Sequence, residues 1–488
     1  MRRTKILATV GPATDRPDRL VQLLEAGVDA FRLNFSHGTD EEHRATLRRA
    51  RAAARSVRQD IAIVADVQGP KIRIGDLATP TVRLTEGRRW RLDRRAIPGD
   101  EERVGVQIPS FERAARPGDP ILLGDGVAEL VVDRVTPQTI ETRVVNGGTV
   151  SGHAGIYLPR AHLRVSVFAA KDRHDAELAL SEGVDFLAVS FVRNAADLVG
   201  VRSWLDRRPG GPDVGLIAKI ERAPALAAID EILELADGIM VARGDLGIEV
   251  PLERLALEQK RLVQRANVAG KFVIVATQML LSMLESARPT RAEATDVANA
   301  VLDGADAVML SEESAVGRYP MEAVRWLARI AAATEPAYDP RPLRELIQRT
   351  GSGAGHERAV AAAAVTLAEG VGARAIATPT HSGRTARMVA ALRPAAPVVA
   401  LSHRGPTRRR LALVRGVHTR MVPAHRNLTE LRREVAALLG HEALAREGPI
   451  VLTAGYPVEG RPTNLVTLVD PAAEIRERRP KDRGRATR

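Results

Sequence analysis

The chain of 488 residues contains no cysteine. This absence excludes a disulfide framework and a thiolate metal site, and it fits a reducing compartment. No apolar run approaches the roughly 20 residues that a membrane helix needs. The start, MRRTKILATVGP, is basic like a signal peptide, but its apolar run is too short and breaks at Gly11 and Pro12. We therefore expect a cytoplasmic protein without a membrane partner.

Aromatic residues make up only 3% of the chain, whereas 72 Lys and Arg against 60 Asp and Glu leave a net charge of +12. A basic balance raises the possibility of nucleic-acid binding. Few aromatics are available for base stacking, however, and arginine is spread over predicted helices such as 44–58 and 407–415. Small anionic ligands explain the charge better. RNA binding remains the alternative, and it predicts tight, steeply salt-dependent complexes.

Apolar residues (45%) and 39 glycines are plentiful, and the length suggests two to four domains. Eight short apolar runs read as buried strands: KILATVGP, AFRLNFSHG, IAIVADVQGP, FLAVSF, GLIAKI, GIMVAR, FVIVAT and AVMLSEE. Helical patterns lie between them near 17–26, 40–57, 194–208, 222–236, 252–269 and 290–303. This alternation predicts an α/β fold, a (β/α)8 TIM barrel.

The barrel pattern is interrupted and then extended. Residues 73–163 alternate polar and apolar residues between Pro-Gly, Gly-Asp and Asn-Gly-Gly turns, which predicts an inserted small β-barrel lid domain between barrel segments 1–72 and 164–338. Residues 343–473 predict a C-terminal doubly wound α/β domain. The charged tail, 474–488, is expected to be disordered.

Residues 217–249 contain the strongest candidates for catalytic side chains. Lys219 and Glu221 close one predicted strand two residues apart, so both point to the same side. Arg243, Gly244 and Asp245 close the next. A lysine beside two carboxylates suits magnesium-assisted phosphoryl transfer. Taken alone, the same residues could be solvated surface pairs.

Other predicted strand ends are also polar, at Arg32, Asn34, Ser36, Asp66, Thr277, Ser311 and Glu313. Carboxyl ends of parallel barrel strands meet at one mouth, where barrel enzymes place their chemistry. Six of the eight strands therefore predict a catalytic mouth. A magnesium-dependent lyase or aldolase acting on pyruvate-like substrates is the rival enzyme, because acids at barrel ends also stabilise enolates.

Several strings resemble the pyruvate kinase family in order and spacing over nearly the whole chain: RRTKILATVGPATD, FRLNFSHG, ADVQGPKIR, VSGHAGIYLP, AKIE, GIMVARGDLGIE, ATQML, ARPTRAEATDVANAVLDGADAVMLSEESA and GRYP. The resemblance implies the same three domains and a homotetramer. It also implies transfer of the phosphoryl group of phosphoenolpyruvate to ADP, giving pyruvate and ATP, with Mg²⁺ (or Mn²⁺) as cofactor.

The resemblance implies roles for individual residues. Lys219 would neutralise the phosphoryl group in transfer, and Glu221 and Asp245 would hold the metal. The amides of Gly244 and Asp245 would bind the substrate carboxylate. The other implied sites are phosphate contacts at Arg32 and Arg73, protonation of the enolate near Thr277 with a proton path through Ser311 and Glu313, and nucleotide contacts at Thr9, Pro12, His37 and Arg73. For Thr9 and His37, plain packing or capping is the alternative.

Lys71 departs from the potassium-dependent pattern. Potassium-requiring members usually carry Glu in this string, and here the string is GPKIR. Their ion would be bound by Asn34, Ser36, Asp66 and the carbonyl of Val67. A tethered ammonium supplies the same charge. We expect Lys71 to replace potassium, as in a branch of bacterial pyruvate kinases that this chain resembles. In SEESA, Glu312 and Ser314 also replace the commoner Gly and Thr.

The string TPTHSGRTA in the C-terminal domain follows a predicted strand and opens a helix. It predicts an effector-phosphate site formed by Thr378, Thr380, Ser382, Gly383, Arg384 and Thr385. A capped helix start is the alternative. The resemblance implies a sugar phosphate or a nucleotide as effector, although Glu459 in the adjacent loop disfavours a densely charged ligand.

Overall fold

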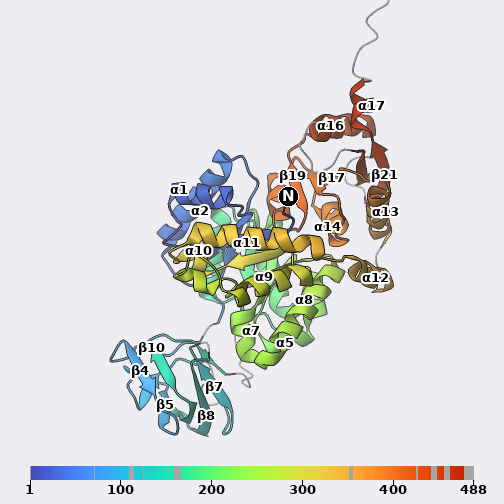
Figure 1. The fold of residues 1–488 in the computed structure, drawn as a ribbon. Helices are drawn as coiled ribbons and strands as arrows, with labels where there is room; N and C mark the ends of the chain where they lie inside the picture. The colour runs from blue at the N-terminus through green and yellow to red at the C-terminus, as the bar shows by residue number, and fades with distance from the viewer. Residues whose placement is uncertain are drawn as a thin grey trace, which may run out of the picture.

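The computed structural model describes residues 2–70, 72–108, 111, 115–124, 126–158, 166–350, 355–424, 427–440, 448–455 and 462–476. The chain forms three regions, with the barrel between the other two (Figure 1). A central barrel carries the inserted β domain on the side where α5 and α7 lie, and the C-terminal domain packs beside the barrel's other end.

The central barrel is closed and entirely parallel, in the order β1-β16-β15-β14-β13-β12-β3-β2. All eight predicted strands are confirmed: β1 (Lys5–Thr9), β2 (Ala30–Asn34), β3 (Ala62–Asp66), β12 (Phe186–Val189), β13 (Gly215–Ile220), β14 (Gly238–Ala242), β15 (Phe272–Ala276) and β16 (Ala307–Leu310). Their near-continuous apolar sequences follow from burial on both faces.

Helices surround this barrel. They are α1 (Pro17–Glu25), α2 (Asp40–Ser56), α3 (Ala170–Ser181), α4 (Ala195–Asp206), α5 (Ala223–Ala227), α6 (Ile229–Leu235), α7 (Arg243–Glu249), α8 (Leu255–Ala269), α9 (Arg291–Asp303), α10 (Glu312–Ala315) and α11 (Pro320–Thr334). Capping boxes start two of them, Thr39 with Glu42 at α2 and Thr290 with Glu293 at α9.

Two predicted helices need correction. The expected helix at 222–236 is two helices, because Ala228 (φ −93°, ψ 12°) leaves the α conformation between α5 and α6. The expected helix at 252–269 begins as a 3₁₀ turn, Leu252–Arg254, after the extended Pro251, and becomes α-helical only at Leu255.

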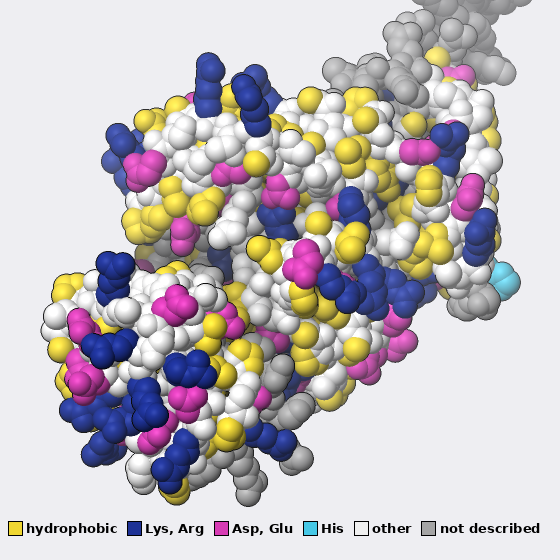
Figure 2. All heavy atoms as spheres, turned by 60° about the horizontal axis from the view of Figure 1, so that its bottom comes forward, with side chains coloured by type: hydrophobic (Ala, Val, Ile, Leu, Met, Phe, Trp, Pro, Cys, Tyr) yellow, Lys and Arg dark blue, Asp and Glu magenta, His cyan; other side chains and the backbone are white. Residues whose placement is uncertain are grey.

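The inserted domain contains two sheets around one core. The larger has the order β11-β7-β8-β9-β5-β6, and the smaller pairs β10 with β4. Their bounds are β4 (Thr81–Leu84), β5 (Arg89–Asp93), β6 (Arg103–Gly105), β7 (Pro120–Leu123), β8 (Ala128–Val135), β9 (Thr139–Asn146), β10 (Gly148–Ser151) and β11 (Ile156–Tyr157). Over this domain, Lys and Arg side chains are interspersed with Asp and Glu (Figure 2), so its outer face is not a uniform basic surface.

The C-terminal domain has a five-stranded sheet of order β19-β18-β17-β20-β21. Four strands are parallel, and β21 pairs antiparallel with β20. The elements are α12 (Arg341–Thr350), α13 (His356–Gly370), β17 (Ala375–Pro379), α14 (Arg384–Ala391), β18 (Val398–Leu401), α15 (Gly405–Leu411), β19 (Val417–Arg420), α16 (Leu428–Gly440), β20 (Ile450–Gly455), β21 (Thr463–Val469) and α17 (Pro471–Arg476).

The expected disordered tail is helical at its start, because α17 extends to Arg476; residues 477–488 lie outside the described residues. Buried polar contacts join this domain to the amino end of the barrel. Arg393 forms a 2.8 Å ion pair with Asp306, and Lys5 Nζ donates to the carbonyl of Val417 at 2.8 Å. In the described part of the chain, no helix is both long and apolar enough to cross a membrane.

Candidate active site

Lys219 lies at the centre of a buried charged cluster at the carboxyl ends of the barrel strands. Its ammonium is 2.9 Å from Glu221 Oε1 and 3.2 Å from Asp66 Oδ1. Lys219 belongs to β13 and Glu221 follows directly after it, so the predicted shared side is confirmed. Burial acts to lower the pKa of the Lys219 ammonium, but Asp66 and Glu221 outweigh it and raise that pKa. The two carboxylates therefore favour the charged form of the lysine.

Ser190 was missed by the sequence analysis, although the string FLAVSF places it directly after β12. Lys219 Nζ donates to Ser190 Oγ at 2.8 Å, and that hydroxyl donates to the carbonyl of Val67 at 2.8 Å. The next residue, Phe191, has a backbone N–H that donates to Glu221 Oε2 at 2.8 Å. The carboxyl end of β12 therefore orients both Lys219 and Glu221.

Arg32 and Asp66 form the third ion pair of the cluster. Arg32 Nε lies 2.6 Å from Asp66 Oδ2, and Arg32 Nη1 donates to Thr9 Oγ1 at 3.1 Å. Asp66 is 1% exposed. Burial alone would raise the pKa of its carboxyl, but Lys219 and Arg32 hold it below its usual range. Two cations thus share one ionised carboxylate. The ammonium of Lys219 is fully engaged by Ser190, Asp66 and Glu221, whereas Arg32 keeps guanidinium N–H groups beyond its contacts with Asp66 and Thr9.

Glu221 and Asp245 are the two carboxylates that the sequence analysis assigned to the metal. Burial raises the pKa of the Glu221 carboxyl; Lys219 opposes this shift, and the charge of Asp245 adds to it. Asp245 lies on α7, and its Oδ1 accepts a 2.6 Å hydrogen bond from the hydroxyl of Tyr157 in β11. Tyr157 was not singled out from the sequence, because only the folded inserted domain brings it to the barrel.

Thr277 occupies a strained position after β15, with φ of 70°. A left-handed backbone is rare for a β-branched residue and costs about 1–3 kcal/mol. Its Oγ1 accepts from the N–H of Gly244 at 2.8 Å and donates to the carbonyl of Ala276 at 2.6 Å. Arg243 supports the same turn by donating to the carbonyl of Thr277 at 2.7 Å. In this structure Thr277 therefore occupies the Gly244 amide that was expected to face a substrate carboxylate.

The remaining predicted residues of the mouth are partly engaged in local contacts. Glu313 is 1% exposed and accepts the N–H groups of Leu280 (3.1 Å) and Ser311 (2.8 Å). Asn34 Oδ1 accepts a hydrogen bond from the N–H of Ser36 at 3.2 Å. In the backbone pairing of β2 with β3, Asn34 lies opposite Asp66. Asn34 and Asp66 thus lie at adjacent strand ends, but Lys71 lies outside the described residues, so the cation pocket stays a prediction.

Three predicted contact residues lie at the edge of the mouth. Arg73 begins the inserted domain, pairs with Gly155 as an isolated bridge, and donates to the carbonyl of His153 at 3.0 Å. Pro12 and His37 are exposed on the loops after β1 and β2. Among the described residues, no hydrogen bond or ion pair joins these three residues to Lys219, so their roles stay predictions.

The predicted effector-phosphate residues gather at the start of α14, beside a cleft of about 730 Å³. Gly383, with φ of +83°, caps this helix, and its N–H donates to Thr380 Oγ1 at 2.9 Å. Arg384 pairs with Glu357 at 2.7 Å, and Thr385 shares a 2.6 Å hydrogen bond with Thr463. Thr380, Ser382, Arg384 and Thr385 line the cleft, whereas Thr378 is fully buried.

The donor set at the mouth fits a hard divalent cation. Glu221 and Asp245 are carboxylates that follow the adjacent strands β13 and β14, and the charge of Asp245 adds to the rise that burial causes in the pKa of the Glu221 carboxyl. No cluster of three or more His, Asp or Glu side chains suited to a metal occurs in the described residues. Magnesium commonly takes only one or two carboxylates and completes its shell with water and substrate oxygens.

A (β/α)8 barrel whose strand ends hold a lysine, a paired arginine and two carboxylates has the charges that phosphoryl transfer requires, and the family matches that follow assign the chain to the phosphotransferases. The pyruvate kinase barrel domain matches residues 1–324, and the pyruvate kinase alpha/beta domain matches residues 358–469. The chain belongs to the pyruvate kinase family.

Similar proteins cover the chain almost completely. Pyruvate kinase of Geobacillus stearothermophilus is 43% identical over 96% of this chain and 80% of its own length. That of Mycobacterium tuberculosis (strain CDC 1551 / Oshkosh) is 42% identical over 93% of this chain and 95% of its own length. The crystal structure of a pyruvate kinase from Cryptosporidium parvum matches with a TM-score of 0.89 and 34% identity, covering 96% of both chains.

Proposed function

We propose that this enzyme transfers the phosphoryl group of phosphoenolpyruvate to ADP at the cluster around Lys219, and that Glu221 and Asp245 hold the required Mg²⁺. The family membership supports the substrates. The observation that carries the site assignment is the position of Lys219, whose ammonium is shared by two buried carboxylates at the barrel mouth.

The residues at the site are proposed to act mainly through their charges. A loose phosphoryl transition state needs neutralisation and alignment more than covalent chemistry. Lys219 supplies a fixed positive charge, and Arg32, anchored by Asp66 and Thr9, directs its remaining guanidinium donors at the phosphoryl oxygens. Magnesium, when bound, would neutralise further oxygen charge. Ser190 positions Lys219, and the Phe191 amide positions Glu221.

Protonation of the enolate is proposed to occur at the carboxyl ends of β15 and β16, which follow β14 in the barrel order. Thr277 is held in its strained turn by Gly244 and Arg243, so its hydroxyl has a defined orientation. We assign Thr277 to the reacting carbon, with Ser311 and Glu313 as the route to solvent. Arg73, Thr9, Pro12 and His37 remain the candidate contacts for the nucleotide, on the basis of family resemblance.

The enzyme is further proposed to work without potassium. Asn34, Asp66 and the Val67 carbonyl lie on adjacent strand ends, and the GPKIR string carries Lys71 where potassium-dependent members carry Glu. A tethered ammonium would supply the charge without capture of an ion. The C-terminal cleft at α14 is proposed to bind a phosphorylated effector, and a homotetramer is the expected assembly.

One assay tests the proposed reaction and its proposed independence from potassium. Pyruvate formation from phosphoenolpyruvate and ADP is measured with Mg²⁺ in a buffer free of potassium, sodium and ammonium, and then with potassium added. Full activity in the first buffer is the expected result. Activity only after potassium is added would refute the role of Lys71 while leaving the reaction intact. Inactivity in both buffers, with and without phosphorylated effectors, would refute the site assignment.

A further inference from the structure

A second cleft, of about 880 Å³, lies between the barrel and the C-terminal domain, away from the catalytic mouth. One wall comes from the amino end of the barrel, namely the start of β1, the end of α2 and the loop 57–61. The other comes from α15 and β19, close to which the chain begins (Figure 1). Because the strands' carboxyl ends carry the active site, this cleft is at the opposite end of the barrel.

The cleft is strongly basic. Seven Lys or Arg side chains line it against two Asp side chains, Asp29 and Asp60, so the lining has a formal excess of five positive charges (7 − 2). Asp60 is already paired with Arg408 at 2.8 Å, and Asp29 with Arg2 at 2.7 Å. Even with Asp185, which pairs with Arg51 (2.5 Å) and Arg409 (2.7 Å) behind the lining, four charges remain uncompensated.

Arg55 and Arg58 are the cations that the fold leaves without a partner. Both are exposed at the cleft wall, and neither makes a side-chain hydrogen bond or ion pair with any residue that the structure describes. Most other arginines at domain contacts are engaged, as Arg408 and Arg409 illustrate. Each of these two free guanidinium groups presents a planar fork of N–H donors that suits phosphoryl oxygens.

Besides burial, the excess positive charge contributes to lowered pKa values of two groups that line the cleft, His418 and Arg51. Burial, with Lys5 and Arg420 nearby, lowers the pKa of His418 to about 4. Burial also lowers the pKa of Arg51, and the neighbouring Arg409 and Arg55 add to that shift. An anion in the cleft would offset the part of both pKa shifts that comes from the neighbouring cations.

We propose that this interdomain cleft binds a small phosphorylated anion carrying at least two negative charges. Its volume suits a ligand of the size of a sugar phosphate or nucleotide. Because its two walls belong to different domains, the bound anion would also strengthen their contact and stabilise the folded chain. The site is separate from the α14 cleft and does not depend on the proposed catalytic roles.

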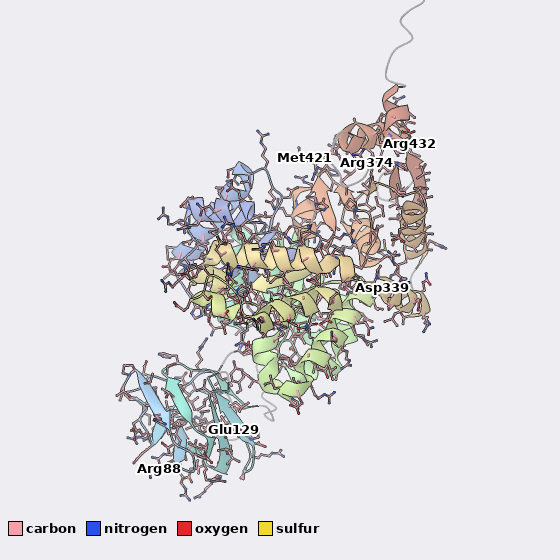
Figure 3. The ribbon with its side chains drawn as sticks, in the orientation of Figure 1. Arg88, Glu129, Asp339, Arg374, Met421 and Arg432 are labelled. Atoms are coloured by element: carbon pink, nitrogen blue, oxygen red, sulfur yellow. The ribbon has the colours of Figure 1, made fainter. Side chains whose placement is uncertain are left out.

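The test uses inorganic tripolyphosphate as the probe and full-length protein, with calorimetric titration as the readout. The variant Arg55→Ala/Arg58→Ala removes the two unpaired cations without breaking an ion pair. Arg88→Ala/Arg89→Ala is the matched control, since it removes the same charge from exposed positions of the inserted domain, where Figure 3 labels Arg88 far from this cleft. Arg384→Ala is the control for the α14 cleft.

The expected result is saturable binding that weakens at least about tenfold in the Arg55/Arg58 variant and is unchanged in both controls. Tripolyphosphate should also raise the thermal midpoint of the parent protein more than that of the variant. An equal loss in the Arg88/Arg89 control would reveal only general charge attraction. A loss confined to Arg384→Ala, or no saturable binding, would equally overturn the proposal. Titration with fructose 6-phosphate and with UMP then distinguishes a sugar phosphate from a nucleotide.

Discussion

The hydroxyl of Tyr157 donates a 2.6 Å hydrogen bond to Asp245 Oδ1, and this contact ties the inserted domain directly to a proposed metal ligand. Tyr157 ends β11, whereas Asp245 lies in α7 of the barrel. Opening of the inserted domain would break the bond, so the orientation of the carboxylate depends on the position of the lid.

We expect Tyr157→Phe to weaken the use of magnesium. Hydrogen-bond partners of metal ligands orient them, and their loss commonly costs about ten- to a hundredfold in metal affinity. The Mg²⁺ concentration for half-maximal activity should rise about tenfold, with a smaller change in kcat at saturating metal. A titration of activity against Mg²⁺ measures this, and the thermal midpoint controls for folding. An unchanged magnesium dependence would show that the contact is only structural.

Lys219→Met should abolish phosphoryl transfer, because no other ammonium lies between Asp66 and Glu221 among the described residues. A fall in kcat of about a thousandfold or more is expected from the loss of a transition-state cation. Steady-state pyruvate production is the measurement, and circular dichroism verifies that the variant folds. Turnover within tenfold of the parent enzyme would defeat the assignment.

Ser190→Ala should impair catalysis less than loss of the lysine itself. It removes one of the three groups around Lys219 Nζ and leaves the Val67 carbonyl without this hydroxyl, at a cost of about 1 kcal/mol in stability. We expect kcat to fall roughly tenfold with KM for phosphoenolpyruvate nearly unchanged. Ser190→Thr keeps a hydroxyl and should recover most of the rate; equal rates in both variants would exclude a positioning role.

His418 should make the folded chain sensitive to acid. Its pKa falls from 6.5 to about 4 in the folded protein, chiefly through burial and then through Lys5 and Arg420, with Asp29 opposing them. Between these values the unfolded chain binds a proton that the folded chain does not. The group therefore costs nothing above pH 6.5, and it reduces stability progressively as the pH falls towards 4, by up to about 3 kcal/mol.

His418→Asn removes this proton uptake. Its thermal midpoint relative to the parent should therefore rise as the pH is lowered from 7 to 4.5. His403→Asn, at an exposed position, is the matched control. Parallel pH profiles for the parent and the His418 variant would contradict the prediction.

Most of the barrel could be predicted from the sequence because each strand is a short apolar run that ends on a polar residue. Lys219 and Glu221 were predicted to share a side from their spacing alone, and the 2.9 Å ion pair agrees. Strand FLAVSF carried the same signal at Ser190. The break between α5 and α6 left no comparable mark, because alanine at position 228 is itself a strong helix former.

The sequence by itself determined which segments form strands and helices, because their apolar residues recur at spacings of two to four residues. It also determined which polar residues stand at the strand ends. Only the tertiary structure decided which distant groups meet. Tyr157 and Asp245 are 88 residues apart in the chain, and Lys219 on β13 reaches Asp66 on β3 across the intervening strand β12. The basic cleft is likewise a property of two domains, because Arg58 and Arg420 become neighbours of one cavity only when the C-terminal domain docks on the barrel.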